Sequence, residues 1–161
     1  MTIHEAAPKR DTTDAGRMSF CGYCGSHVIE AAARGSRVCE RCHLGLILTG
    51  RSDAVPAEQD AFIVVDALMR VRAVSKRAEE LLRISETDAV NQLVWDFLVP
   101  AEDGAQTTSK LAGEIVTASR LDVGPRRTVL RPRDVFGVRY GVRIAGCSPG
   151  PAAILVLGEQ L

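Results

Sequence analysis

The sequence predicts an α+β fold with antiparallel strands, preceded by a small metal-binding module. Two observations predict this organisation. After residue 60, apolar alternation typical of strands occurs at both ends of the segment, and apolar positions with helical spacing lie between them. Before residue 51, four of the five cysteines occur as two closely spaced pairs. With 161 residues, of which 46% are hydrophobic, the chain is long enough for one ordinary domain and a small module.

The two cysteine pairs read Cys21-Gly-Tyr-Cys24 and Cys39-Glu-Arg-Cys42, with fourteen residues between them. This spacing is typical of a four-thiolate zinc site, because each pair binds the metal from one tight turn while the connecting segment completes a tetrahedron. The segment resembles a treble-clef or zinc-ribbon finger, and a short helix is expected to begin at Leu44. We therefore predict a zinc ion bound by Cys21, Cys24, Cys39 and Cys42.

Other chemistries of the same cysteines stay open. A thiol redox switch would use the pairs as disulfides, and Cys39-Glu-Arg-Cys42-His43 matches the motif for covalent haem attachment. Haem attachment needs an exported protein and leaves the first cysteine pair without a role, so structural zinc is favoured. His27 or His43 in place of a thiolate is a further alternative. Cys147 has no partner in the sequence and is expected to be a small buried side chain.

The chain is expected to fall into four parts. Residues 1–17 lack periodicity and are interpreted as a disordered tail, residues 18–50 as the zinc-binding module, residues 51–59, with Pro56, as a linker, and residues 60–161 as the main domain. Because the module holds few apolar side chains, we expect it to unfold without metal. Separate cores also predict separate unfolding transitions for the module and the main domain.

The predicted elements of the main domain run from strands to helices and back to strands. Period-two alternation indicates the strands, Ser75 and Ser85 are candidate N-caps, and Pro100 and Gly124 end helical segments. In order, the expected elements are strands over 61–66 and 69–74, helices over 75–82, 85–98 and 103–121, and strands over 128–130, 135–145 and 152–157.

Three segments of the main domain resemble the PAS family. They are a strand that ends in Asp, a strand that enters a helix, and an apolar segment that ends in Pro: Phe62-Ile-Val-Val-Asp66, Val74-Ser-Lys-Arg-Ala-Glu-Glu-Leu-Leu82 and Trp95-Asp-Phe-Leu-Val-Pro100. The resemblance covers residues 58–161 and implies a five-stranded antiparallel sheet with helices on one face. The sequence departs from the family at Ser75, where Asn is frequent, and at Arg83, where Gly is frequent.

PAS domains are sensor and interaction modules, so the resemblance implies a small ligand between sheet and helices, or pairing with partners. No cysteine lies between Cys42 and Cys147, which argues against the flavin-reactive cysteine of light-sensing members. His4, His27 and His43 all precede the domain, which excludes a His-ligated haem of the PAS type. An unidentified small ligand in the PAS-like pocket and a fully packed core both stay open. Members of the family often self-associate, so we expect a homodimer.

The charge and hydropathy of the chain bear on its partners and location. Lys plus Arg equals Asp plus Glu, at 20 each, so there is no overall field that would attract nucleic acid or a membrane. No apolar run approaches the roughly 20 residues of a membrane span, and the N-terminus lacks a signal-peptide core, so we expect a cytoplasmic protein. The arginines of residues 120–143 form a locally basic region. A solvated sheet face carrying Arg139 and Arg143 is preferred there over a surface for an acidic partner or nucleic acid.

Enzyme activity is not expected from this sequence. It has no histidine after His43 and no Gly-rich phosphate loop, and four thiolates leave no open position at a zinc ion. The sequence predicts a small cytoplasmic signalling or regulatory adaptor, in which the PAS-like domain senses a ligand or dimerises and the zinc finger docks a protein partner. The alternatives are a DNA-binding transcriptional regulator that uses the finger, for which the nearby charges are too mixed, and a thiol redox sensor.

Overall fold

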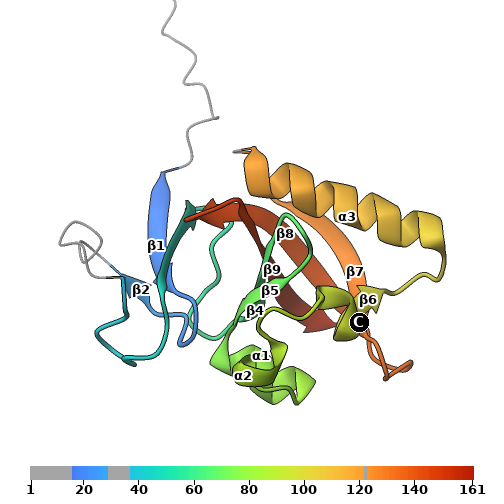
Figure 1. Cartoon of the computed structure of the whole chain (residues 1–161), viewed down its shortest axis with the longest axis horizontal. Coiled ribbons are helices and arrows are strands. Elements are labelled where there is room, and N and C mark those ends of the chain that lie inside the picture. Colours follow the sequence, from blue (N-terminus) through green and yellow to red (C-terminus); the bar gives the residue numbers. More distant parts are fainter. Residues whose placement is uncertain (1–15, 29–36, 122) are drawn as a thin grey trace, which may run out of the picture.

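The protein is described by a computed structural model that covers residues 16–28, 37–121 and 123–161 (Figure 1). The predicted tail falls outside these residues up to residue 15, and Arg17 already begins the first strand. The elements in chain order are β1 (Arg17–Cys21), β2 (His27–Val28), β3 (Ile47–Arg51), β4 (Ala61–Asp66), β5 (Val71–Val74), α1 (Lys76–Leu82), α2 (Glu86–Ala89), η2 (Val94–Asp96), β6 (Leu98–Pro100), α3 (Ala105–Arg120), β7 (Arg126–Pro132), β8 (Tyr140–Ser148) and β9 (Ala152–Gln160).

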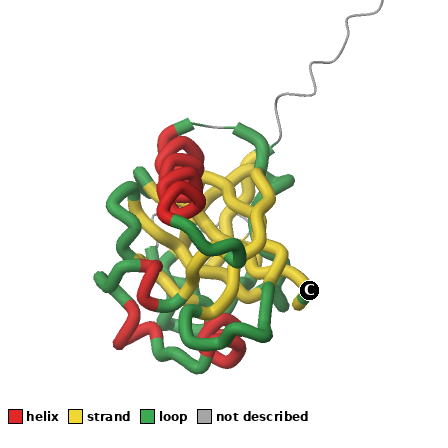
Figure 2. The backbone as a smooth tube through the Cα atoms, turned by 90° about the vertical axis from the view of Figure 1, so that its right-hand side faces the viewer, coloured by secondary structure: helices red, strands yellow, loops and turns green. Residues whose placement is uncertain are grey.

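One antiparallel sheet runs through the whole structure, in the order β2-β1-β3-β8-β9-β4-β5. β8 is its organising strand. β9 pairs along one edge of β8, while β7 and β3 share the other edge, with β7 at the start of β8 and β3 at its end. β6 pairs with the outer edge of β7. The sheet is curled, and α3 lies across one of its faces, as the two views show (Figures 1 and 2).

The main domain has the α+β organisation expected from its PAS resemblance. Two strands, β4 and β5, form a hairpin, helices follow, and three strands, β7 to β9, close the antiparallel sheet. α3 forms where helical spacing of apolar residues predicts it, and it buries Leu111, Ile115 and Ala118. The backbone of α3 comes so close to β8 that a Cβ at Gly146 would overlap the backbone carbonyl oxygen of Ala118. Gly146 therefore permits this close packing. No helix in the described part of the chain has the length and apolar content needed to cross a bilayer.

The first helix begins as predicted, whereas the second is much shorter than expected. The Ser75 hydroxyl caps α1 by accepting from the Ala78 amide at 3.1 Å. The predicted helix over 85–98 is corrected: α2 ends at Ala89, and a single 3-10 turn and β6 follow. The helix is shorter because a tertiary interaction replaces it: the backbone after α2 forms hydrogen bonds with β5. The Gln92 carbonyl accepts from the Val71 amide at 2.8 Å, so these residues serve the sheet edge and not a helix.

Two cores lie on opposite faces of the sheet, because successive side chains along each strand alternate between them. The helix-side core consists of Ala61, Ile63, Val65, Met69, Val71, Val74, Ala78, Ala89, Val94, Leu98, Leu111, Ile115, Ala118, Leu130, Tyr140, Val142, Ile144, Ala153, Leu155 and Leu157. The partly buried side chains of Trp95 and Phe97 pack against it. The module-side core consists of Phe20, Leu48, Ala54, Val55, Phe62, Val64, Ala145, Cys147, Ala152, Ile154 and Val156.

The module-side core joins the predicted zinc-binding module to the main domain. Phe20 of β1 meets Phe62 of β4 edge to face, with ring centroids 5.7 Å apart. In the predicted linker 51–59, residues 54–56 are buried. Arg143, expected on a solvated face, lies beneath this segment and donates to the carbonyl oxygens of Ala54 and Val55, at 3.4 and 3.3 Å. The segment between the two parts is therefore packed onto the sheet, and strands and side chains of both parts share one structure.

Candidate metal centre

The four predicted metal ligands converge. The Sγ atoms of Cys21, Cys24, Cys39 and Cys42 all lie within 4.8 Å of one another. Cys21 Sγ is 3.6 Å from Cys42 Sγ, and Cys24 Sγ is 3.9 Å from Cys39 Sγ. Tetrahedral zinc with Zn–S bonds of about 2.3 Å places its sulfurs roughly 3.8 Å apart. The donor set therefore fits a four-coordinate metal ion. Each cysteine of the first pair lies at about this distance from one cysteine of the second pair.

Two tight turns bring the sulfurs together and direct backbone amides at them. At the end of β1, the amides of Tyr23 and Cys24 donate to Cys21 Sγ at 3.3 and 3.4 Å. After the second pair, the Gly45 amide approaches Cys42 Sγ at 3.5 Å. Such donors stabilise thiolates, and around a bound metal they orient the ligands. The local geometry thus supplies both the ligands and the hydrogen bonds that thiolate ligands need.

The thiol pKa values within this cluster diverge. Burial raises the pKa of Cys21 to about 12. Burial also opposes ionisation of Cys39, but hydrogen bonds from the backbone amides of Cys42 and Arg41, together with those from the side chains of Ser26 and Cys21, outweigh it and lower the pKa of Cys39 to about 6. Burial also raises the pKa of Cys42, but hydrogen bonds from the amides of Gly45 and Leu44, together with those from the Cys21 and Cys24 side chains, outweigh burial and lower this pKa. A bound cation would favour the thiolate form of all four sulfurs.

The two cysteine turns pack so closely that residue 45 has to be glycine. Replacement of Gly45 should therefore disturb the metal site. A Cβ at this position would overlap the Cys21 sulfur and lie 2.8 Å from the Tyr23 backbone nitrogen. We expect Gly45→Ala to weaken zinc binding by about 10–100-fold, measured by competition with a chelator. Gly113→Ala is the matched control, because a Cβ there meets nothing within 4 Å. Equal zinc affinity in the two variants would contradict the assigned geometry.

The other residues considered from the sequence do not join the four sulfurs. His27 Nε2 lies 2.7 Å from the Pro56 carbonyl oxygen, and His43 is exposed with a φ of 59°. Cys147 is buried in the module-side core, as expected. The helix expected from Leu44 is absent from the described residues, and β3 forms just beyond that position. Because β3 pairs with β1 and β1 with β2, the arrangement is that of an antiparallel ribbon.

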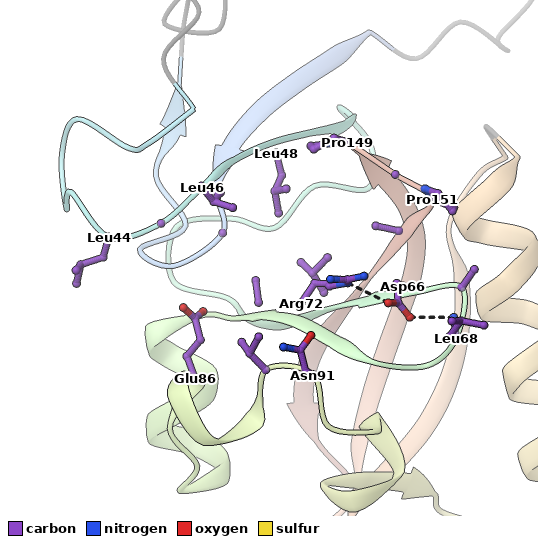
Figure 3. A pocket seen from close by; sticks show the side chains of 18 residues that line it. Leu44, Leu46, Leu48, Asp66, Leu68, Arg72, Glu86, Asn91, Pro149 and Pro151 are labelled. Carbon is purple, nitrogen blue, oxygen red and sulfur yellow. Dashed lines mark hydrogen bonds and ion pairs between the residues drawn. The ribbon is translucent and has the colours of Figure 1, made fainter.

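A cleft of about 630 Å³ adjoins the cysteine site and was not anticipated from the sequence (Figure 3). One wall is the loop that carries Leu44 and Leu46, directly after the second cysteine pair. The β4–β5 hairpin forms the opposite wall, with Leu68 at its turn, and the turn between β8 and β9 closes a third side. The floor is formed by small or buried apolar side chains of several strands, namely Leu48, Val64, Ala73 and Ala152.

The cleft also contains charged groups from β4, β5 and α2. Asp66 Oδ2 accepts from Arg72 Nε at 2.9 Å, and Asp66 Oδ1 accepts from the amides of Leu68 and Arg70. Asp66 therefore both shapes the hairpin turn and balances the charge of Arg72 (Figure 3). Glu86 accepts from the Val74 amide at 2.9 Å. Burial, and to a smaller extent the charge of Glu79, raise the pKa of Glu86.

Comparison with known proteins finds similarity only to parts of solved structures. No family model matches this chain, and no curated protein matches it. Two solved structures share part of its arrangement. The PAS domain of an HTR-like protein from Haloarcula marismortui has a TM-score of 0.45 and 15% sequence identity over 63% of this chain and 81% of that chain. The DhaR(N)–DhaL complex from E. coli has a TM-score of 0.42 and 13% identity over 63% of this chain and 32% of that chain.

Proposed function

We propose that this protein is a small, non-enzymatic regulatory protein that acts by binding other proteins. Its PAS-like sheet is the scaffold, and a structural zinc ion bound by the four cysteines holds β1, β2 and β3 in place on that scaffold. The observation that carries the proposal is the convergence of four sulfurs at tetrahedral spacing, within a segment whose strand β3 pairs with β8 of the main domain. Metal binding would then stabilise the sheet to which β3 and the strands of the main domain both belong.

The packing of the helix-side core supports partner binding over an enclosed ligand. Its side chains are at most 7% exposed and come from both the sheet and the helices. A PAS ligand between sheet and helices would have to displace such side chains at a cost of order 1 kcal/mol or more for each. The cleft beside the cysteine site lies on the module side of the sheet and is already open. Recognition at that cleft requires no rearrangement of the core.

Two of the basic side chains near the cysteine site are paired with carboxylates, which supports a protein partner over DNA. Arg41 Nη1 lies 3.1 Å from Glu58 Oε1, and Arg51 lies 3.0 Å from Asp53 Oδ2. Paired arginines present little net positive charge to a phosphate backbone. In the same way, Arg131 and Arg133 of the basic region near β7 are paired with Asp103 and Asp96.

Native mass spectrometry of the protein purified without added metal tests the proposed function. We expect one zinc ion per chain, lost on denaturation, and no organic passenger. Cys147→Ala is the matched cysteine control and is expected to keep its zinc, since Cys147 lies outside the sulfur cluster. Absence of zinc, a haem group, or full zinc occupancy in a Cys39→Ser variant would contradict the proposal.

A further inference from the structure

We infer that the cleft beside the cysteine site docks an amphipathic segment of a protein partner, with apolar side chains entering between Leu46 and Leu68 and a basic side chain facing Glu86. This inference rests on the proposed function, because one wall of the cleft is the loop after the second cysteine pair. It adds the place of docking and the chemistry of the partner.

Exposed leucines on both walls favour a partner that covers a wide area. Leu44 and Leu46 are 70% and 60% exposed on one wall, and Leu68 is 74% exposed on the other. Three large exposed apolar side chains thus surround the apolar floor of one cleft, and exposed apolar groups gathered in this way mark protein interaction sites. A small molecule held at the floor would leave the three leucines in water. A helical segment of a partner that lies across the cleft would bury all of them, and their burial would favour binding through the hydrophobic effect.

The partner segment has to bind through its side chains, because the edge of β5 is already occupied. β5 is the last strand of the sheet path, and an open edge would allow a further strand to pair with it. The Val71 amide donates to the Gln92 carbonyl, and the Asn91 amide donates to the Val71 carbonyl. The Val74 amide donates to Glu86. These bonds take up hydrogen-bonding groups along the outer edge of β5, so strand addition is not the mode of docking.

The charges in the cleft specify a basic partner residue. The charge of Arg72 is balanced by Asp66, with Nε and Oδ2 2.9 Å apart. Glu86 lines the cleft close to Glu79, whose carboxylate accepts from the Glu86 amide at 2.8 Å. Within the described ranges, neither of these two glutamates forms an ion pair with a basic side chain. A Lys or Arg of the partner would supply the missing opposite charge in a partly buried place, which gives specificity.

The test is selection of random peptides, displayed on phage and long enough for several helical turns, on the full-length zinc-loaded protein. We expect enriched peptides with apolar residues at positions i and i+4 and a nearby Lys or Arg. Leu46→Asp and Leu68→Asp should each weaken binding of a synthetic enriched peptide by about tenfold or more. Phe136→Asp is the control for an exposed apolar residue elsewhere, since Phe136 is 76% exposed and lies outside the cleft.

The charge requirement has its own pair of variants. Glu86→Gln keeps an acceptor for the Val74 amide and removes the charge. It should therefore weaken binding of a peptide with a basic residue by about tenfold. Asp88→Asn, on the exposed side of the same helix, should leave binding unchanged. Binding that survives both leucine substitutions, enrichment of acidic peptides, or no enrichment would overturn the inference. The inference would also be overturned if the wild-type protein carried a small molecule or a second copy of this chain that is absent from both leucine variants.

Zinc content measured on every protein separates the two proposals. Zinc-loaded protein that selects no such peptide contradicts the docking inference and leaves the metal site in place. Protein without zinc that still selects peptides at the cleft contradicts the proposed structural metal, because Leu44 and Leu46 follow the second cysteine pair directly. Removal of zinc with a chelator should abolish peptide binding, since one wall of the cleft loses its anchoring turn.

Discussion

A Cys39→Ser variant is expected to lose its metal and to unfold throughout the chain in one transition. Structural zinc sites bind with about 10–16 kcal/mol, whereas the net stability of a domain is about 5–15 kcal/mol. Loss of even part of the metal contribution is therefore comparable with the entire free energy of unfolding. Because β3 pairs with β8 and Phe20 packs on Phe62, the loss reaches the main domain. This expectation replaces the two separate transitions that the sequence alone predicts.

Circular dichroism and scanning calorimetry of the variant would measure this effect, with and without a chelator added to the wild-type protein. His43→Asn is the matched control beside the second cysteine pair, since His43 is exposed and Asn tolerates its φ of 59°. We expect this control to have the melting temperature of the wild-type protein. A Cys39→Ser variant whose larger part melts at the wild-type temperature would show that the module and main domain unfold separately.

Phe62→Ala is expected to reduce the free energy of unfolding by about 3–5 kcal/mol. Phe62 has 0% exposure and lies in the module-side core, on the sheet face opposite the helices. Its ring meets Phe20 at an interplanar angle of 86°, so truncation removes the main aromatic contact between β4 and β1. The resulting cavity lies between two sheet segments that are fixed by hydrogen bonds, and it has little room to collapse.

Urea unfolding of Phe62→Ala, Phe20→Ala and the double variant measures both the loss and the coupling. The aromatic pair should show a coupling energy of about 0.5–1.5 kcal/mol. Phe136→Ala removes the same side chain at an exposed position, where it stacks on Arg131 at 4.6 Å, and should cost no more than about 1 kcal/mol. A cost below 1 kcal/mol for Phe62→Ala, or zero coupling with Phe20, would contradict the shared core.

Much of the local structure could be predicted because its causes lie close together in the sequence. The cysteine spacing predicts two tight turns, and the four sulfurs converge as that spacing requires. Ser75 caps α1, where a Ser precedes residues with helical spacing. The hairpin of β4 and β5 follows from an apolar run and an alternating segment joined by a short turn. The main error in the helical region, the length of α2, arose where the backbone bonds to β5 instead of to itself.

The sequence by itself determined the candidate metal ligands, the α+β order of elements and the alternation of the strands, because spacing and periodicity act over a few residues. Only the tertiary structure decided that β3 joins β8, that Arg143 supports the segment at residues 54–56, and that a cleft forms beside the cysteines. These features depend on contacts between residues far apart in the chain. The exposure of Leu46 and Leu68 likewise depends on which residues surround them in the fold. The residue type alone does not predict whether a particular leucine is buried or exposed.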